Sequence, residues 1–245
     1  MTLPSGQLAT DLLAWWDAHG RHYIPWKQAS ASAQPDPYGI WIAEVMLQQT
    51  QLQVALPYWQ RGMQELPTLD ALASADEQQV LLLWQGLGYY SRARRLHQAA
   101  QQLQGQLWPQ DLEDWLALPG IGRSTAGSIL SSAFDRPFAI LDGNVKRVLA
   151  RLTAFEQPPA RHSAHFWSLS EQLLDRQRPR DFNQALMDLG ATLCTPRQPD
   201  CPRCPWQSHC AAYAAGSPER FPVTESPNPL PLPGTGAGVG LNAAG

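Results

Sequence analysis

The sequence is poor in lysine and has no long apolar run. Of its 18 basic residues only Lys27 and Lys146 are lysines, and the others are arginines. No run of about 18 apolar residues occurs, which excludes a membrane-spanning helix. Residues 1–20 also lack the basic start and apolar block of a secretory signal. We therefore expect a cytoplasmic protein that is not bound to a membrane.

The overall charge does not by itself indicate a nucleic-acid-binding protein. The net charge is −3, with 44% hydrophobic and 16% charged residues, which is typical of a globular chain long enough to bury a core. The distribution of charge is more informative, because Arg92, Arg94 and Arg95 fall within four positions. These three arginines allow a local basic face on an otherwise acidic protein.

Signals for β-strands are nearly absent, whereas helical periodicity dominates. The hairpin-like pair Asp142-Gly143 is followed by helical sequence. Ser74 and Glu77 read as a capping box ahead of an apolar run. The sequence therefore predicts an all-α fold of about ten helices. The spacing of apolar residues places helices at 8–19, 40–50, 51–59, 92–103, 125–134, 145–153, 166–174 and 182–194.

The composition changes near residue 217. Six prolines follow within 16 residues, and then a stretch rich in Gly and Ala. Such a segment cannot bury enough apolar surface to fold by itself. We expect residues 217–245 to be disordered.

All four cysteines lie within 17 residues, in the pattern C-x6-C-x2-C-x5-C. They are Cys194, Cys201, Cys204 and Cys210. Four thiols this close suit a metal centre that organises a loop too short for a core of its own. Disulfides are disfavoured in a cytosolic protein. The spacing alone leaves a zinc ion and an iron–sulfur cluster as equal alternatives, and in either case protein thiolates fill the ligand positions.

The segment Leu118-Pro-Gly-Ile-Gly-Arg-Ser124 connects two predicted helices. Gly120 and Gly122 permit a tight turn, and the helix that starts near Ser124 follows at once. Outward-facing N–H groups and a helix N-terminus together favour an anion. The pattern fits either a site for one DNA phosphate or an ordinary turn between helices.

Two carboxylates have surroundings that suit acid catalysis. Glu44 has apolar residues on both sides, and burial raises the pKa of a carboxyl toward the value that a general acid needs. Asp142 stands where an apolar segment meets a helix start, a position that is also typical of an N-cap. Lys146 follows Asp142 by four residues and either pairs with it or faces solvent. Two carboxylates in unlike environments are the minimum for breaking a glycosidic bond.

Several motifs together resemble one family, the helix-hairpin-helix DNA glycosylases with a [4Fe–4S] cluster, and among them the MutY-type adenine glycosylases. The resemblance covers about residues 8–215 and favours iron–sulfur over zinc. In chain order the motifs are E-V-M-L-Q-Q-T at 44–50, G-L-G-Y-Y-S-R-A-R at 86–94, L-P-G-I-G-R-S-T-A-G at 118–127, L-D-G-N-V-K-R-V at 141–148 and the four cysteines.

The resemblance implies two helical lobes with a cleft between them. A six-helix module would span 28–139 and hold the hairpin. An iron–sulfur module would combine 1–27 with 140–216. Double-stranded DNA with a mispaired adenine would bind across the cleft to what is expected to be a monomer, and the target base would be flipped out.

Roles for individual residues also follow from the resemblance. Asp142 would stabilise the oxocarbenium-like sugar, with a transient covalent bond as one form of this role. Glu44 would protonate N7 of the adenine. Tyr89 would be the wedge in the duplex, with Gln48 beside the gap. The further residues expected to contact DNA or the base are Arg21, Gly120, Gly122, Ser124, Asn144, Lys146 and Gln184.

The hairpin residue Ser124 predicts a monofunctional enzyme. The related endonuclease III group has a lysine nucleophile at this position, and a serine cannot form a Schiff base. We therefore expect hydrolysis of the N-glycosidic bond without efficient strand cleavage. Lys146 is expected near enough to Asp142 to trap a sugar aldehyde, which leaves weak lyase activity open.

One departure from the family concerns specificity. Full-length members carry a C-terminal Nudix-like domain that recognises 8-oxoguanine, and here a Pro/Gly/Ala stretch stands instead. The chain is then either a truncated member or a short homologue. We expect removal of adenine opposite guanine or 8-oxoguanine, with a reduced preference for the oxidised base. The alternatives are a thymine or uracil mismatch glycosylase and a non-catalytic DNA-binding module.

Overall fold

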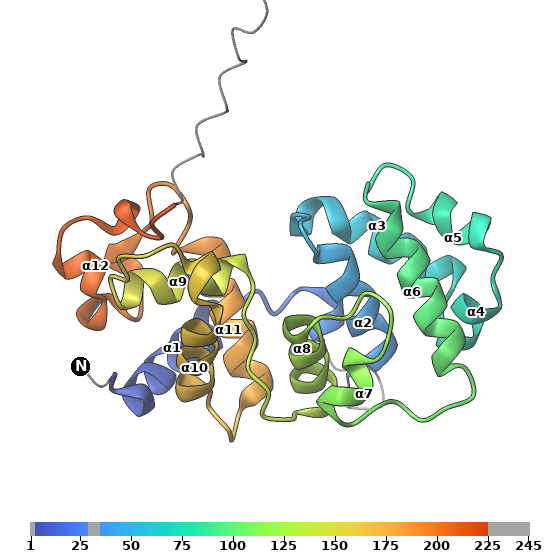
Figure 1. Cartoon of the computed structure of the whole chain (residues 1–245), viewed down its shortest axis with the longest axis horizontal. Coiled ribbons are helices and arrows are strands. Elements are labelled where there is room, and N and C mark those ends of the chain that lie inside the picture. Colours follow the sequence, from blue (N-terminus) through green and yellow to red (C-terminus); the bar gives the residue numbers. More distant parts are fainter. Residues whose placement is uncertain (1–2, 29–34, 225–245) are drawn as a thin grey trace, which may run out of the picture.

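The computed structural model describes residues 3–28 and 35–224, and every regular element in these ranges is a helix (Figure 1), which confirms the all-α prediction. Within the same ranges no helix has the length and apolar character that crossing a membrane would need. The α-helices are α1 Ser5–His19, α2 Pro37–Leu47, α3 Leu52–Glu65, α4 Leu69–Ser74, α5 Glu77–Leu83, α6 Tyr90–Leu103, α7 Leu112–Leu116, α8 Arg123–Phe134, α9 Gly143–Leu152, α10 Ser163–Leu173, α11 Pro179–Thr192 and α12 Ala211–Ala214. The 3₁₀ turns are η1 Pro25–Lys27, η2 Pro159–His162, η3 Cys201–Arg203, η4 Gln207–His209 and η5 Pro218–Arg220.

The apolar side chains form two main cores, one in each lobe of Figure 1. The first core contains residues of α1, α9, α10 and α11, so the N-terminal helix packs against the C-terminal part of the chain. The second contains residues of every helix from α2 to α8. A smaller cluster around Ile24 and Trp26 joins η1 to α2 and α8. The chain therefore starts in one lobe, builds the other and returns.

Helix α2 is the most deeply buried element of the second lobe. Its residues from Tyr38 to Ala43, as well as Val45 and Met46, are buried. Trp41 is completely inaccessible, and its loss would cost about 3–5 kcal/mol. A carboxylate in this helix is therefore placed in the protein interior by the packing of its neighbours.

The predicted capping box at Ser74 is wrong, because the two helices there are separate. Ser74 is the last residue of α4, and its Oγ accepts a hydrogen bond from Gln104 Nε2. Asp76 is the N-cap of α5, and its Oδ1 accepts from the N–H of Gln78 at 2.8 Å. Asp76 directly precedes the helix, so its carboxylate reaches the free N–H groups of the first turn. Ser74 lies three residues before the helix start and is less well placed to cap it.

The helix predicted over 40–50 ends earlier, at Leu47. Gln49 adopts a positive φ of 58°, which no α-helix accommodates. The guanidinium of Arg92 replaces the next helical turn, since it donates to the carbonyls of Val45, Met46 and Gln48. A side chain from α6 thus satisfies the carbonyl groups at the end of α2.

The start of the predicted disordered segment is structured. In residues 217–224, η5 is followed by Phe221, which is only 2% exposed. The carbonyl of Phe221 accepts a hydrogen bond from Nε of the buried Arg151 at 2.9 Å. The prediction of disorder for 217–224 is therefore wrong, because an aromatic side chain anchors this segment on α9. The rest of that prediction, for 225–245, lies outside the described residues.

Candidate active site

A cavity of about 790 Å³ opens between the two lobes, and both predicted carboxylates line it. Glu44 reaches it from α2, and Asp142 reaches it from the start of α9. Residues 98 positions apart in the chain therefore share one space. A volume of this size is within the range of sites that bind small organic groups. Five other predicted residues line the same cavity, namely Arg21, Gln48, Ser124, Asn144 and Gln184.

Glu44 is partly buried, and this burial raises the pKa of its carboxyl from 4.5 to about 7. The nearby charge of Asp142 raises the pKa further, whereas the Ser128 hydroxyl and the Lys27 ammonium lower it. The dominant cause is the loss of hydration of the carboxylate. Near neutral pH, Glu44 therefore holds its proton on a substantial fraction of molecules and is able to donate it.

Asp142 is the N-cap of α9, as its position predicted. Its Oδ1 accepts the N–H of Val145 at 2.7 Å. Burial raises the pKa of Asp142, whereas the backbone N–H groups of Val145 and Asn144 and the charge of Arg147 lower it. These donors stabilise the charged form. The capping role and the catalytic assignment are compatible, because the same carboxylate caps the helix and faces the cavity.

The hairpin before α8 is formed as predicted, between α7 and α8. Gly120 has a φ of +80°, and a Cβ there would come within 2.9 Å of the Arg95 side chain. Gly122 is the N-cap residue of α8. The first turn of α8 therefore leaves N–H groups free for an anion, with the stem of Arg95 packed against the turn.

Ser124 is used inside the protein. Its Oγ accepts a hydrogen bond from the N–H of Leu141 at 3.0 Å, one residue before Asp142. On the neighbouring wall of the cavity, Gln48 Nε2 donates to Thr125 Oγ1 at 3.3 Å. Helix α8, which follows the hairpin, therefore contacts both the segment that leads to Asp142 and the segment that follows α2.

Tyr89 lies at the N-cap of α6 in a left-handed conformation, with a φ of 53°, and is 59% exposed. The Arg92 guanidinium lies 5.1 Å from the centre of its ring. Arg92 also contacts Gly88 through its carbonyl and the segment after α2, so one arginine holds the loops of Gln48 and Tyr89 together. A bulky exposed aromatic in a strained, supported turn is suited to insertion into a duplex.

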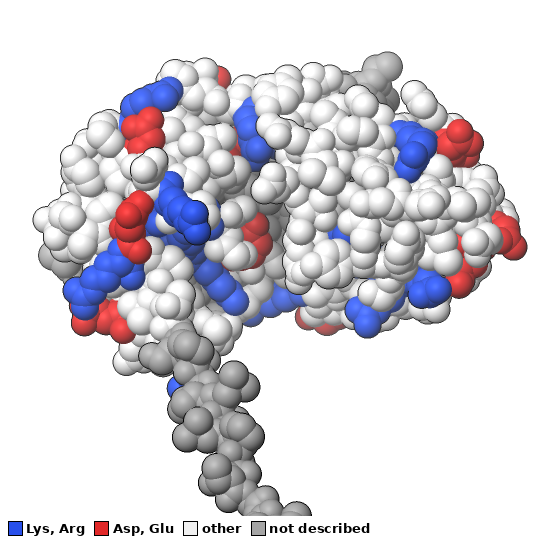
Figure 2. Space-filling view, turned by 90° about the horizontal axis from the view of Figure 1, so that it is seen from above, with Lys and Arg blue, Asp and Glu red and all other residues white. Residues whose placement is uncertain are grey.

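The three neighbouring arginines do not form a single basic face. Arg92 points toward the carbonyls described above. Arg94 pairs with Glu77 at 3.3 Å, and Arg95 packs against Gly120. Figure 2 shows instead that basic side chains border the hollow between the lobes, with an acidic side chain inside it. The positive charge that lines the cavity comes from Arg21, Lys27 and Arg147, which lie on separate segments of the chain.

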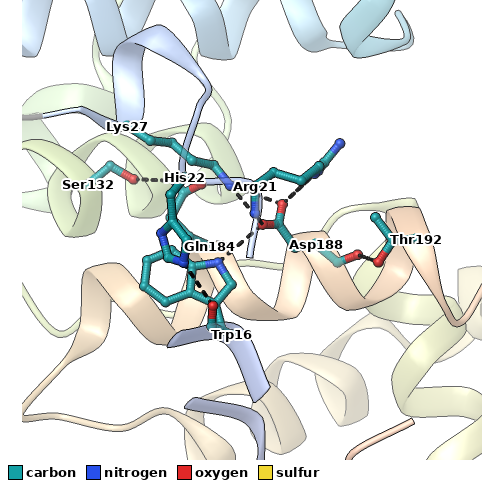
Figure 3. A network of polar contacts seen from close by, with 8 residues as sticks. All are labelled: Trp16, Arg21, His22, Lys27, Ser132, Gln184, Asp188 and Thr192. Carbon is teal, nitrogen blue, oxygen red and sulfur yellow. Dashed lines mark hydrogen bonds and ion pairs between the residues drawn. The ribbon is translucent and has the colours of Figure 1, made fainter. Parts of the chain in front are cut away.

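A polar network centred on Asp188 of α11 closes one side of the cavity (Figure 3). Asp188 is buried and accepts from the backbone N–H and the side chain of Arg21, from Lys27 Nζ and from Trp16 Nε1. The 2.9 Å pair with Lys27 holds η1 against α11. Arg21 was expected to contact DNA or the target base. In the structure it is hydrogen-bonded to Asp188, although it still lines the cavity.

Sequence reasoning missed Asp188 and Lys27. A weak signal existed, because Asp188 follows Gln184 by four residues and so lies on the same face of the predicted helix. Lys27 is one of only two lysines in the chain. No pattern in the sequence pairs two residues that are 161 positions apart.

Gln184 and Asn144 line the cavity, and both have partners within the protein. Gln184 is buried and its Nε2 donates to Ser132 Oγ at 2.9 Å, across the contact between α11 and α8. Asn144 Oδ1 accepts from Arg147 at 2.9 Å. Their free polar atoms remain available to a base or sugar in the cavity.

Lys146 does not meet Asp142 in the way that was expected. Its Nζ donates to Ser163 Oγ at 3.4 Å, on α10, and Lys146 is not among the residues that line the cavity. The N-cap geometry explains the difference, because Asp142 turns back onto the first turn of α9 while Lys146 projects one turn further along. The expectation that Lys146 traps a sugar aldehyde beside Asp142 is not supported by this geometry.

The four cysteines line one cavity between α9, the end of α11, η3 and η4. Arg151 of α9 donates to Cys194 Sγ at 3.4 Å and to the carbonyl of Thr195. Among the described residues, no three His, Cys, Asp or Glu side chains are grouped closely enough to hold one metal ion. The donor set, four thiols around one space with an arginine beside it, is chemically suited to an iron–sulfur cluster.

Comparisons with known proteins identify the family of this chain. The family model for HhH-GPD superfamily base excision DNA repair proteins matches residues 42–172. The adenine DNA glycosylase of Mus musculus is 46% identical over 83% of this chain, and that of Homo sapiens is 45% identical over 82%. The chain spans 41% and 38% of these two relatives' lengths.

Solved structures show the same fold. A thermostable thymine-DNA glycosylase matches 86% of this chain and 97% of its own, with a TM-score of 0.76 and 26% identity. A trapped endonuclease III–DNA covalent intermediate matches 88% of this chain and 99% of its own, with a TM-score of 0.68 and 20% identity. The chain therefore belongs to the HhH-GPD superfamily of base excision DNA repair proteins.

Proposed function

We propose that this protein is a monofunctional adenine DNA glycosylase, which hydrolyses the N-glycosidic bond of adenine mispaired with guanine or 8-oxoguanine. The observation that supports this most directly is the shared cavity of Glu44 and Asp142. The two carboxyls have unlike surroundings, as an acid and a charge-stabilising group require. The curated relatives described above bear the name of the same activity.

In the proposed reaction the extruded adenine enters the cavity and Glu44 donates its proton to N7. The base then leaves as a neutral group rather than as an anion. Asp142 acts as the carboxylate, which two backbone N–H groups and Arg147 stabilise against the burial that raises its pKa. The carboxylate stabilises the positive charge that develops on the sugar. Water completes the hydrolysis and leaves an abasic site.

DNA is proposed to bind across the cavity mouth. Gly120, Gly122 and the first turn of α8 would hold one phosphate, while Tyr89 would enter the duplex with Gln48 beside the gap. We keep the division into a six-helix module, 28–139, and an iron–sulfur module, 1–27 with 140–216. The two apolar cores support it. Binding as a monomer and a cytoplasmic location belong to the same proposal.

Cys194, Cys201, Cys204 and Cys210 are proposed to hold a [4Fe–4S] cluster. The cluster would tie the chain after α11 to α9, whose N-cap is Asp142, and it would take no part in breaking the bond. The test is metal analysis of the purified protein. We expect about four irons per chain and a yellow-brown colour with absorbance near 400 nm, and one equivalent of zinc without colour would contradict the assignment.

A base-release assay with matched duplexes tests the proposed function. The duplexes carry A opposite 8-oxoguanine, A opposite G or T opposite G, and each is analysed with and without hot alkali. We expect release from both adenine duplexes, and strand breaks only after alkali. A Glu156→Gln variant, which alters an exposed carboxyl paired with Arg220, serves as a control and should behave as wild type.

Other outcomes would favour the alternatives. Release of thymine in preference to adenine would indicate a thymine mismatch glycosylase. Tight binding of all three duplexes without release of any base would indicate a DNA-binding module. A strong preference for 8-oxoguanine over guanine would contradict the reduced preference that we expect.

A further inference from the structure

Ser128, on α8, lies within the candidate site although no motif singled it out. Its side chain is 2% exposed and faces the cavity that contains Glu44 and Asp142. Its Oγ is fully buried and has no hydrogen-bond partner among the described residues. A buried hydroxyl without a partner is destabilising, because it has lost its hydrogen bonds to water. Such a cost calls for a compensating interaction, and the carboxyl of Glu44, which lines the same cavity, is able to provide one.

The neighbouring serines of α8 show what an ordinary structural role looks like. Ser131 Oγ donates to the carbonyl of Ser128 and accepts from Asn183 Nδ2. Ser132 Oγ accepts from Gln184 Nε2. Both hydroxyls join α8 to itself or to α11. Ser128 differs from them, because its hydroxyl faces the cavity and the carboxyl of α2.

We propose that Ser128 is a positioning residue for Glu44, whose hydroxyl orients the carboxyl in the cavity and stabilises the carboxylate left when the proton passes to the base. The inference rests on the proposed acid role of Glu44. When Glu44 gives up its proton, the hydroxyl donates a full hydrogen bond to the new carboxylate. The hydroxyl keeps its own proton, so no atom is transferred to or from Ser128.

The surroundings of Glu44 leave this role to Ser128. The charged groups that act on Glu44 are Asp142, which raises its pKa, and Lys27, which lowers it. The ammonium of Lys27 is held by Asp188 at 2.9 Å and so is committed elsewhere. Ser128 opposes the effect of burial more strongly than Lys27 does. Ser128 therefore lowers a pKa that burial has raised, and its hydroxyl has no other hydrogen-bond partner among the described residues.

The test measures the titration of Glu44 itself. Protein labelled with ¹³C at the Glu side-chain carboxyls is titrated by NMR without DNA, and the Glu44 signal is assigned by its loss in Glu44→Gln. We expect Ser128→Ala to raise the pKa of Glu44 by about one unit, as loss of a hydrogen bond to a charged group predicts. Ser128→Thr retains the hydroxyl and should restore most of the shift.

The matched control is Ser131→Ala, which removes a buried hydroxyl one turn along the same helix. It should leave the pKa of Glu44 unchanged, because Ser131 does not line the cavity. An unchanged Glu44 pKa in Ser128→Ala, or an equal shift in Ser131→Ala, would overturn the inference.

Single-turnover base release extends the test to the reaction. In Ser128→Ala the rate at pH 6 should fall several-fold, because Glu44 has become a weaker acid. The alkaline limb of the pH–rate profile should move to higher pH as the pKa of Glu44 rises. The titration does not depend on activity. A wild-type protein that releases no base would therefore contradict the proposed function, while the NMR shift would still decide the role of Ser128.

Discussion

The hydroxyl of Ser124 accepts a hydrogen bond from the backbone N–H of Leu141 at 3.0 Å. This contact connects the hairpin helix of one lobe to the residue that precedes Asp142 in the other. In the proposed complex, helix α8 would contact a DNA phosphate at the hairpin and would also hold the residue before Asp142. Ser124 would then couple binding of the DNA backbone to the alignment of Asp142.

Replacing Ser124 with alanine should weaken this coupling. The N–H of Leu141 loses its partner, which costs about 1 kcal/mol of stability. The single-turnover rate should fall several-fold, since small displacements of a reacting group are costly. Thermal unfolding and base release check the two effects separately. Ser163→Ala, which removes a hydroxyl bonded to Lys146 outside the cavity, is the control; an equal fall in rate there would argue against coupling.

Asp142→Asn should abolish base release without unfolding the protein. Asparagine is as good an N-cap as aspartate, so the contact with Val145 survives and stability changes little. The neutral amide cannot stabilise a cationic sugar, and we expect a loss of at least about 10³-fold in rate. Release kinetics and duplex affinity are measured side by side. Near-normal turnover in this variant would exclude the proposed mechanism.

The pH dependence of stability should show the cost of burying Glu44. Unfolded chains release this proton near pH 4.5, whereas the folded protein retains it up to about pH 7. The stabilising contribution of Glu44 is therefore complete below pH 4.5 and is lost as the pH rises to 7. Glu44→Gln removes this titration and should be more stable than wild type at pH 8, by up to about 3 kcal/mol.

Denaturant unfolding at pH 5 and pH 8 tests this expectation. Glu171→Gln alters an exposed carboxyl and should show no such pH-dependent gain. The Glu44→Gln variant should also be inactive, because it has no proton to donate. A stability difference from wild type that is equal at both pH values would mean that Glu44 titrates normally.

Arg92→Met should separate DNA distortion from the chemical step. Loss of the guanidinium leaves the carbonyls at the end of α2 without their donor and frees the loops of Gln48 and Tyr89. We expect duplex affinity to fall at least tenfold, along with a stability loss of about 2 kcal/mol. Binding of a mismatched duplex and of single-stranded DNA is compared.

The single-stranded ligand needs no wedge, so its affinity should change less. Arg94→Met is the matched control, because Arg94 is exposed and pairs only with Glu77 in this region. Equal losses in both variants would show a general effect of charge rather than a role in holding the two loops.

The sequence by itself determined the helical class, the hairpin at 118–124, the N-cap at Asp142 and the cysteine spacing. Each depends on residues close together in the chain, where periodicity and capping chemistry act. It also singled out Glu44, because its apolar neighbours along α2 indicated burial. The meeting of Glu44 with Asp142 rested on the family resemblance rather than on any local pattern.

Tertiary structure alone decided which polar groups meet. Asp188 with Lys27 and Arg92 with the end of α2 are contacts between helices distant in sequence, and Ser128 and Glu44 share one cavity for the same reason. The same packing turned Lys146 toward Ser163 and anchored Phe221 on α9. Burial of apolar faces sets how helices cross, and only that crossing places a hydroxyl, an ammonium or a guanidinium beside a particular carboxyl or carbonyl group.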